Sequence, residues 1–184
     1  MQIPNHYQTL YIRFIRFACG MTIFALLSGI LFQESTKKIP FSTTYPPGIH
    51  WEAVYHLAFV HGHIFLIGVL IPLAIIGMLH FGLLLGGKTI SEKLLKLGSW
   101  LYLPNALLAV LLMLYKGYHY VISIRMGQLD FAQINHSFFC GCHLLRQIIY
   151  GLSHTLMSVG LGILVVAIWK SLSNLKPNKA NEAN

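Results

Sequence analysis

The sequence predicts an all-α fold, that of a polytopic membrane protein with a four-transmembrane-helix bundle, and three observations support this. Of its 184 residues, 55% are hydrophobic and 10% are charged, whereas about a quarter of the residues in an ordinary soluble domain are charged. The mean hydropathy is +0.64. Four apolar runs are each long enough for a helix of about twenty residues to cross a bilayer. We expect one membrane domain over residues 1–170.

The apolar runs predict spans at about residues 14–32, 56–84, 97–116 and 146–169. The second run is longer than a perpendicular helix needs, so we expect that helix to tilt or to begin outside the hydrocarbon. About residues 117–146 are rich in His and aromatic side chains and are expected to form a partly structured interfacial loop. The polar tail, residues 171–184, is expected to be disordered and cytoplasmic.

Basic residues predict the orientation of the chain. There are 13 Lys and Arg against 5 Asp and Glu, an excess that in a membrane protein marks cytoplasmic ends and contacts with acidic lipid rather than nucleic acid. Eight of the basic residues fall on the side of the two termini and five on the other side. We therefore expect an inner-membrane protein with both termini in the cytoplasm. The partner that the composition predicts is the lipid bilayer.

Histidines in the apolar spans predict a cofactor, because an imidazole in lipid costs free energy unless it is paired, solvated or bound. His61 and His63 lie in the second span and His154 in the fourth. These two spans run in the same direction, and all three residues lie within about two turns of the outer face. Four-helix membrane bundles hold haem between such facing ligands. The sequence thus predicts a bis-His haem b site near the outer leaflet, with His61 and His154 as metal ligands.

Only one of the two histidines on the second span can face the fourth, because two residues turn a helix by about 200°. His61 shares its face with Gly68, which would let a planar cofactor approach the backbone, and this favours His61. The sequence leaves the choice between His61 and His63 open.

Polar residues around this layer are predicted to support the cofactor. His143, Gln147, Tyr150 and His154 follow one another at spacings of four, three and four on one helix face. We expect His63, Tyr150 and Gln147 to hydrogen-bond to the ligands or to the edge of the cofactor. Lys116 and Arg146, at the outer ends of the third and fourth spans, would meet the haem propionates, or would extend to lipid headgroups.

The run from His61 to Pro72 resembles the second helix of haem–copper oxidase subunit I. In that family a histidine, an apolar run with an aromatic residue and a proline eleven positions later supply an axial ligand to the low-spin haem. The resemblance implies a haem b held by His61 and His154. That family has twelve helices and a copper site, whereas this chain has four predicted spans and no second apolar histidine cluster, which argues against oxygen reduction.

The overall layout is similar to that of a family of small four-helix bacterial membrane proteins of uncharacterised function. Members of that family carry His-x-His in the second helix, a basic residue followed by Gly after the third, and a Gly-x-x-His-like element in the fourth. The matching residues here are His61-Gly62-His63, Lys116-Gly117 and Gly151-Leu152-Ser153-His154. The similarity spans most of residues 10–170.

Three functions remain open at this stage. The first is haem binding for electron transfer or for haem or gas sensing. The second is binding or transport of copper or zinc by the histidines at positions 56, 61, 63 and 154, with a soft-metal loop around Cys140 and Cys142. The third is a structural or assembly protein without a cofactor. No catalytic residue is predicted, because the carboxylates lie outside the spans. Small residues spaced by four suggest a homo-oligomer, and a respiratory membrane protein is an expected partner.

Overall fold

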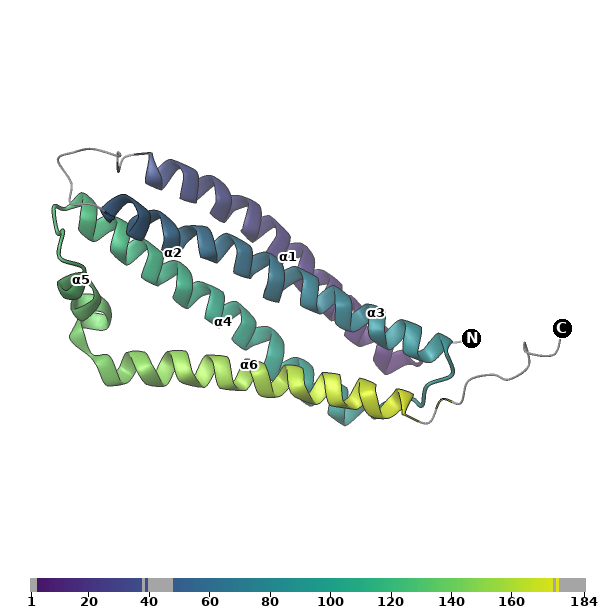
Figure 1. Cartoon of the computed structure of the whole chain (residues 1–184). Helices are drawn as coiled ribbons and strands as arrows, with labels where there is room; N and C mark the ends of the chain where they lie inside the picture. Colours follow the sequence, from purple (N-terminus) through teal and green to yellow (C-terminus); the bar gives the residue numbers. More distant parts are fainter. Residues whose placement is uncertain (1–2, 38, 40–47, 174, 176–184) are drawn as a thin grey trace.

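Four long helices form the bundle in a computed structural model that describes residues 3–37, 39, 48–173 and 175 (Figure 1). All four are long and apolar enough to cross a membrane, which confirms the predicted fold class. Their bounds are Asn5–Thr36 for α1, Ile49–Leu84 for a second helix composed of α2 (Ile49–His63), η1 (Ile64–Leu70) and α3 (Ile71–Leu84), Glu92–Arg125 for α4, and His143–Leu172 for α6.

The helices extend beyond the predicted spans, most clearly in α4. This helix continues to Arg125 instead of ending near residue 116, so the first part of the expected interfacial loop is helical. The physical reason is a continued apolar face: Val121 and Ile124 are buried in one cluster with Ala53 and Leu57 of α2. Burial of that face favours helix over loop.

Two short helices, α5 (Phe131–Ser137) and the 3-10 helix η2 (Phe138–Gly141), connect α4 to α6. The carboxylate of Asp130 caps α5 by accepting the backbone N–H of Ala132 at 2.8 Å and of Gln133 at 3.2 Å. Phe139 and Cys140 then adopt left-handed φ angles of 57° and 53°, and the chain reverses into α6. Of the predicted tail, residues 171 and 172 belong to α6, and most of the remainder lies outside the described residues.

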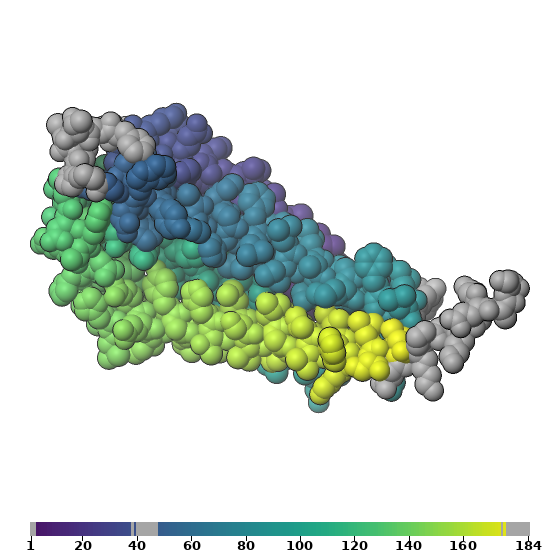
Figure 2. Space-filling view, viewed as in Figure 1, coloured from purple at the N-terminus to yellow at the C-terminus, as the bar shows by residue number. Residues whose placement is uncertain are grey.

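The helices are arranged so that α4 lies between the second helix and α6 (Figure 1). Helix α1 packs on the second helix, and α6 packs along α4. The N-terminus of α1 and the C-terminus of α6 lie at one end of the bundle, the terminal end, and α5 lies at the other, the α5 end. Figure 2 shows α6 separated from α2 toward the α5 end. We call the surface between α2 and α6, with α4 at its base, the wedge.

Glycines set how closely α4 approaches its two neighbours. A Cβ on Gly160 of α6 would lie 2.6 Å from the backbone nitrogen of Tyr102. A Cβ on Gly117 of α4 would lie 2.6 Å from a methyl carbon of Leu57 on α2. Small residues permit this close backbone packing, through which membrane helices gain van der Waals contact.

A π-helical segment interrupts the second helix directly after His63. Its backbone bonds follow the i→i−5 pattern, as in the bond from the N–H of Ile71 to the carbonyl of Leu66. In this register the carbonyl of Ile67 would pair with residue 72, which is a proline and has no N–H. The hydroxyl of Tyr102 donates to this carbonyl at 2.6 Å. One tyrosine of α4 therefore satisfies the backbone acceptor that Pro72 leaves without a donor.

Candidate functional site

The structure places His61 against α1. Its Nδ1 lies 2.9 Å from the carbonyl oxygen of Ala25, and its ring would be 3.2 Å from a Cβ on Gly29. Gly29 therefore makes room for the imidazole, and His61 ties the second helix to α1. Because α6 packs on α4 and α3, the structure does not bring His61 and His154 together.

His63 lies on the other side of α2, as the 200° turn between the two residues requires. Its side chain is half-buried, and Nδ1 lies 2.8 Å from the carbonyl oxygen of Phe59. Seven residues earlier on the same helix face, His56 packs on Tyr120 of α4, with ring centroids 4.6 Å apart. His63 thus lies on the flank of α2 that borders α4, away from α1, at the edge of the wedge.

His154 borders the wedge from α6. Its side chain is exposed, Nδ1 lies 2.8 Å from the carbonyl oxygen of Tyr150, and the two rings are stacked. Leu172 lies five helical turns further along the same face, where it packs next to Gly82 of α3. This face of α6 is therefore the one that looks toward the second helix.

Contacts with α4 place the two histidines at the same depth. On α6, the Tyr150 hydroxyl donates to the carbonyl of Leu112 at 2.7 Å, and Gly160 lies beside Tyr102. On the second helix, Leu57 lies against Gly117, and Ile67 accepts the Tyr102 hydroxyl. Interpolation at about 1.5 Å per residue puts both His63 and His154 beside residues 107 and 108 of α4, within about one turn.

The hydrogen bonds also determine which ring nitrogen is available. A backbone carbonyl only accepts, so Nδ1 of His63 and of His154 must carry the proton. Nε2 is then the unprotonated nitrogen, and no described residue donates to it in either side chain. Metal-binding histidines commonly bind through one nitrogen while the other donates to a carbonyl. In this tautomer each Nε2 has a lone pair that could bind a metal.

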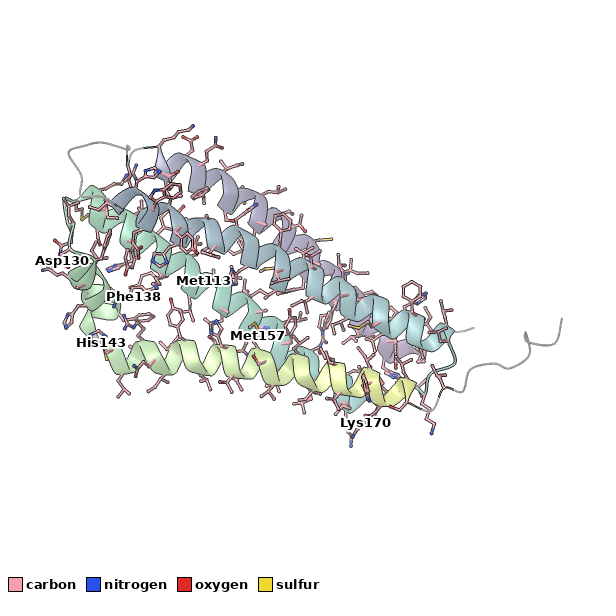
Figure 3. The ribbon with its side chains drawn as sticks, viewed as in Figure 1. Met113, Asp130, Phe138, His143, Met157 and Lys170 are labelled. Atoms are coloured by element: carbon pink, nitrogen blue, oxygen red, sulfur yellow. The ribbon has the colours of Figure 1, made fainter. Side chains whose placement is uncertain are left out.

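A pocket of about 300 Å³ lies between α4, α5, η2 and α6 at the α5 end. It brings together four residues that the sequence analysis proposed, Lys116, Arg146, Gln147 and Tyr150, with two that it missed, Asn135 and Phe138. Figure 3 shows Phe138 at this end, and Met113 of α4 and Met157 of α6 further along the same two helices. No spacing in the sequence could connect α5 to this pocket, because the turn before α6 decides where α5 packs.

Arg146 is held in place by α5. Its Nη1 donates to the carbonyl oxygen of Asn135 at 3.1 Å and to its Oδ1 at 2.9 Å. The Lys116 ammonium lies 5.9 Å above the ring of Tyr120. The pocket lining includes no carboxylate, and Glu52 of α2 pairs with His56, at 3.6 Å.

The histidines of the copper or zinc alternative do not gather. Within the described part of the chain, no group of three or more His, Cys, Asp or Glu side chains could hold a metal ion. His61 faces α1 and His56 faces Tyr120. In the turn before α6, the rings of His136 and His143 lie 5.0 Å apart, and the nearby thiols of residues 140 and 142 are free and exposed.

The chain is a small four-helix membrane protein by the length and hydropathy of its helices. No protein-family model matches it, and neither the curated proteins nor the solved structures give a significant match.

Proposed function

We propose that the chain is a b-type haem protein of the bacterial inner membrane in which His154 of α6 and His63 of α2 are the axial ligands. The observation that carries the proposal is the pair itself: a half-buried imidazole, His63, and an exposed one, His154, border the wedge at one depth, each with Nδ1 bonded to a carbonyl. The proposal takes His63 in place of the sequence-favoured His61, because the ring of His61 packs against Gly29 and bonds to the Ala25 carbonyl of α1.

The residues around the pair would hold and orient such a group. Tyr150 stacks on the His154 ring, and its hydroxyl is fixed to α4, so this imidazole has a fixed orientation. Phe59 packs edge-on against His63 at 6.0 Å. Arg146 lies two turns from His154 toward the α5 end, about 12 Å along the helix, where it could neutralise a propionate. Haem, when bound, would supply a one-electron redox centre, and it would bind a gas only if one of the two histidines were displaced.

The orientation proposed from charge is compatible with this site. With both termini in the cytoplasm, the α5 end faces outward. The histidine pair then lies beside the middle of α4 (Glu92–Arg125), deeper than the two turns from the outer face that the sequence predicted. The role would be electron transfer or sensing of haem or a gas, with a respiratory membrane protein as a candidate partner.

Absorption spectra of the detergent-purified chain, oxidised and dithionite-reduced, test the proposal. We expect a b-type α-band in the wild type that disappears in His63→Ala and in His154→Ala. His56→Ala is the matched control, because it removes one imidazole from the same face of α2 as His63. This variant should retain the band. His61→Ala should retain the band but unfold more readily.

Two results would overturn the proposal in different ways. A featureless spectrum of wild-type protein from haem-replete cells would exclude haem b. Metal analysis of that same sample would then distinguish the copper or zinc alternative from a protein without a cofactor. Loss of the band in His61→Ala together with its retention in His63→Ala would instead support the ligand pair that the sequence favours.

One observation favours a structural role for a single histidine. The bond from His61 Nδ1 to the Ala25 carbonyl joins two helices, as expected in a structural or assembly protein in which histidines tie helices together. If all four of the histidines at positions 56, 61, 63 and 154 have this role, each alanine variant should change stability alone.

A further inference from the structure

Two cations line the pocket at the α5 end, and the carboxylate of Glu52 on α2, which acts on Lys116 electrostatically, lies outside the lining. Lys116 reaches it from α4 and Arg146 from α6, and no acidic side chain lines it. The only ion pairs among the described residues are Lys37 with Glu34, and His56 with Glu52. Two neighbouring positive charges without an anion repel each other, so an anion bound between them would be stabilised.

The backbone adds positive potential to the same place. Arg146 lies in the first turn of α6, which begins at His143 and runs for 30 residues. The N-terminus of a helix carries a partial positive charge and N–H groups without intrahelical partners. Asn135 holds the guanidinium through two hydrogen bonds from one nitrogen. The remaining N–H groups of Arg146 are therefore available without the loss of further side-chain freedom.

The walls of the pocket are aromatic. Phe138 and Tyr150 line it together with the amide of Gln147, and Tyr115 packs against Phe138 with ring centroids 4.9 Å apart. Leu144, Leu145 and Ile148 on the outer side of α6 are exposed, as expected for a surface in lipid. A site with a cationic end and apolar walls at the edge of a bilayer suits a molecule with an acidic head and an apolar body.

We propose that this pocket binds the acidic oxygen-bearing group, carboxylate or phosphate, of an amphipathic molecule, between Lys116 and Arg146. Two molecules carry this chemistry into a membrane: an acidic phospholipid, through its phosphate, and a haem, through its propionates. The phospholipid source is independent of the proposed function, and the propionate source rests on it.

Thermal unfolding of the full-length chain in a neutral detergent tests the site. The probe is dihexanoyl phosphatidylglycerol, with zwitterionic dihexanoyl phosphatidylcholine as the control lipid. We expect the acidic lipid to raise the Tm saturably, because a ligand that binds only the folded state stabilises it. Lys116→Gln and Arg146→Gln should each weaken binding about tenfold or more, as expected for the loss of a hydrogen bond to a charged group.

One further variant and one comparison keep the test decisive. Arg125→Gln removes one positive charge at the same end of α4 but outside the pocket, and it should bind the lipid as the wild type does. Arg146→Gln also loses the bonds to Asn135, so Lys116→Gln, which leaves those bonds intact, separates binding from folding. Equal Tm shifts with the two lipids, or equal affinities in the wild type and in Lys116→Gln, would overturn the proposal.

A titration with haem identifies which of the two molecules supplies the acidic group. Apo-protein is titrated with haem b and with its propionate dimethyl ester, and Lys116→Gln is compared with the wild type. A propionate source predicts that the substitution weakens haem but not the ester, and that bound haem abolishes the lipid response. A phospholipid source predicts that the lipid response persists whether or not haem is bound. Failure of haem to bind at all would leave the lipid result unaffected and would count against the proposed function alone.

Discussion

We predict that the hydroxyl of Tyr102 stabilises the fold because Pro72, on the second helix, cannot donate a backbone hydrogen bond. Its hydroxyl donates to the carbonyl of Ile67 at 2.6 Å, and the side chain is fully buried at 0% exposure. Tyr102→Phe would leave that carbonyl without a donor in an apolar interior. A net hydrogen bond contributes about 1 kcal/mol, and interhelical bonds in membrane proteins average about 0.6 kcal/mol with a maximum near 1.7. We expect Tyr102→Phe to lower the free energy of unfolding by about 1 kcal/mol.

A double-mutant cycle with Pro72 tests the physical reason. Pro72→Ala restores an N–H that can donate to Ile67 within the π segment; if the segment instead returns to α-helical bonding, the N–H of Ile71 becomes the donor to Ile67. In the Pro72→Ala background, the cost of Tyr102→Phe should therefore fall to less than half of its value in the wild type. Tyr120→Phe is the control, since within the described residues the Tyr120 hydroxyl makes no hydrogen bond. We expect that variant to change stability by a few tenths of a kcal/mol at most.

Reversible unfolding in mixed micelles, followed by far-ultraviolet circular dichroism as the denaturing detergent is increased, measures all the variants. If the effects of Tyr102→Phe and Pro72→Ala simply add, the link between the proline and the tyrosine is wrong. If Tyr102→Phe lowers the free energy of unfolding no more than Tyr120→Phe does, the Tyr102 hydroxyl does not stabilise the protein by donating to the Ile67 carbonyl.

Two further predictions concern glycines at helix contacts. Gly160→Ala places a Cβ 2.6 Å from a backbone nitrogen of α4 and should cost about 1–3 kcal/mol through forced separation of the helices. Gly162→Ala, which meets nothing within 4 Å, should be neutral or stabilising in the same unfolding assay. Gly29→Ala brings a Cβ to 3.2 Å from the His61 ring, so the usual gain of about 0.5–1 kcal/mol from replacing a helical glycine should appear only in a His61→Ala background. Equal effects of Gly29→Ala in both backgrounds would show that His61 does not occupy this position.

The sequence by itself determined that the chain has four long helices, because the length of an apolar run is directly related to the thickness of a bilayer. It also determined that His61 and His63 point in opposite directions, since this follows from the turn of 100° per residue. It proposed Lys116, Arg146, Gln147 and Tyr150, and the structure brings these four together in one pocket.

Only the tertiary structure decided which of the two histidines contacts α1. Local sequence sets the angle between two side chains but not where neighbouring helices pack, and here contacts at Gly29 and Gly117 direct His61 to α1 and leave His63 at the wedge. The contribution of Asn135 has the same origin, because a turn of a few residues carries α5 back over the start of α6. Long-range packing between residues far apart in sequence sets these positions, and no periodicity within one segment contains that information.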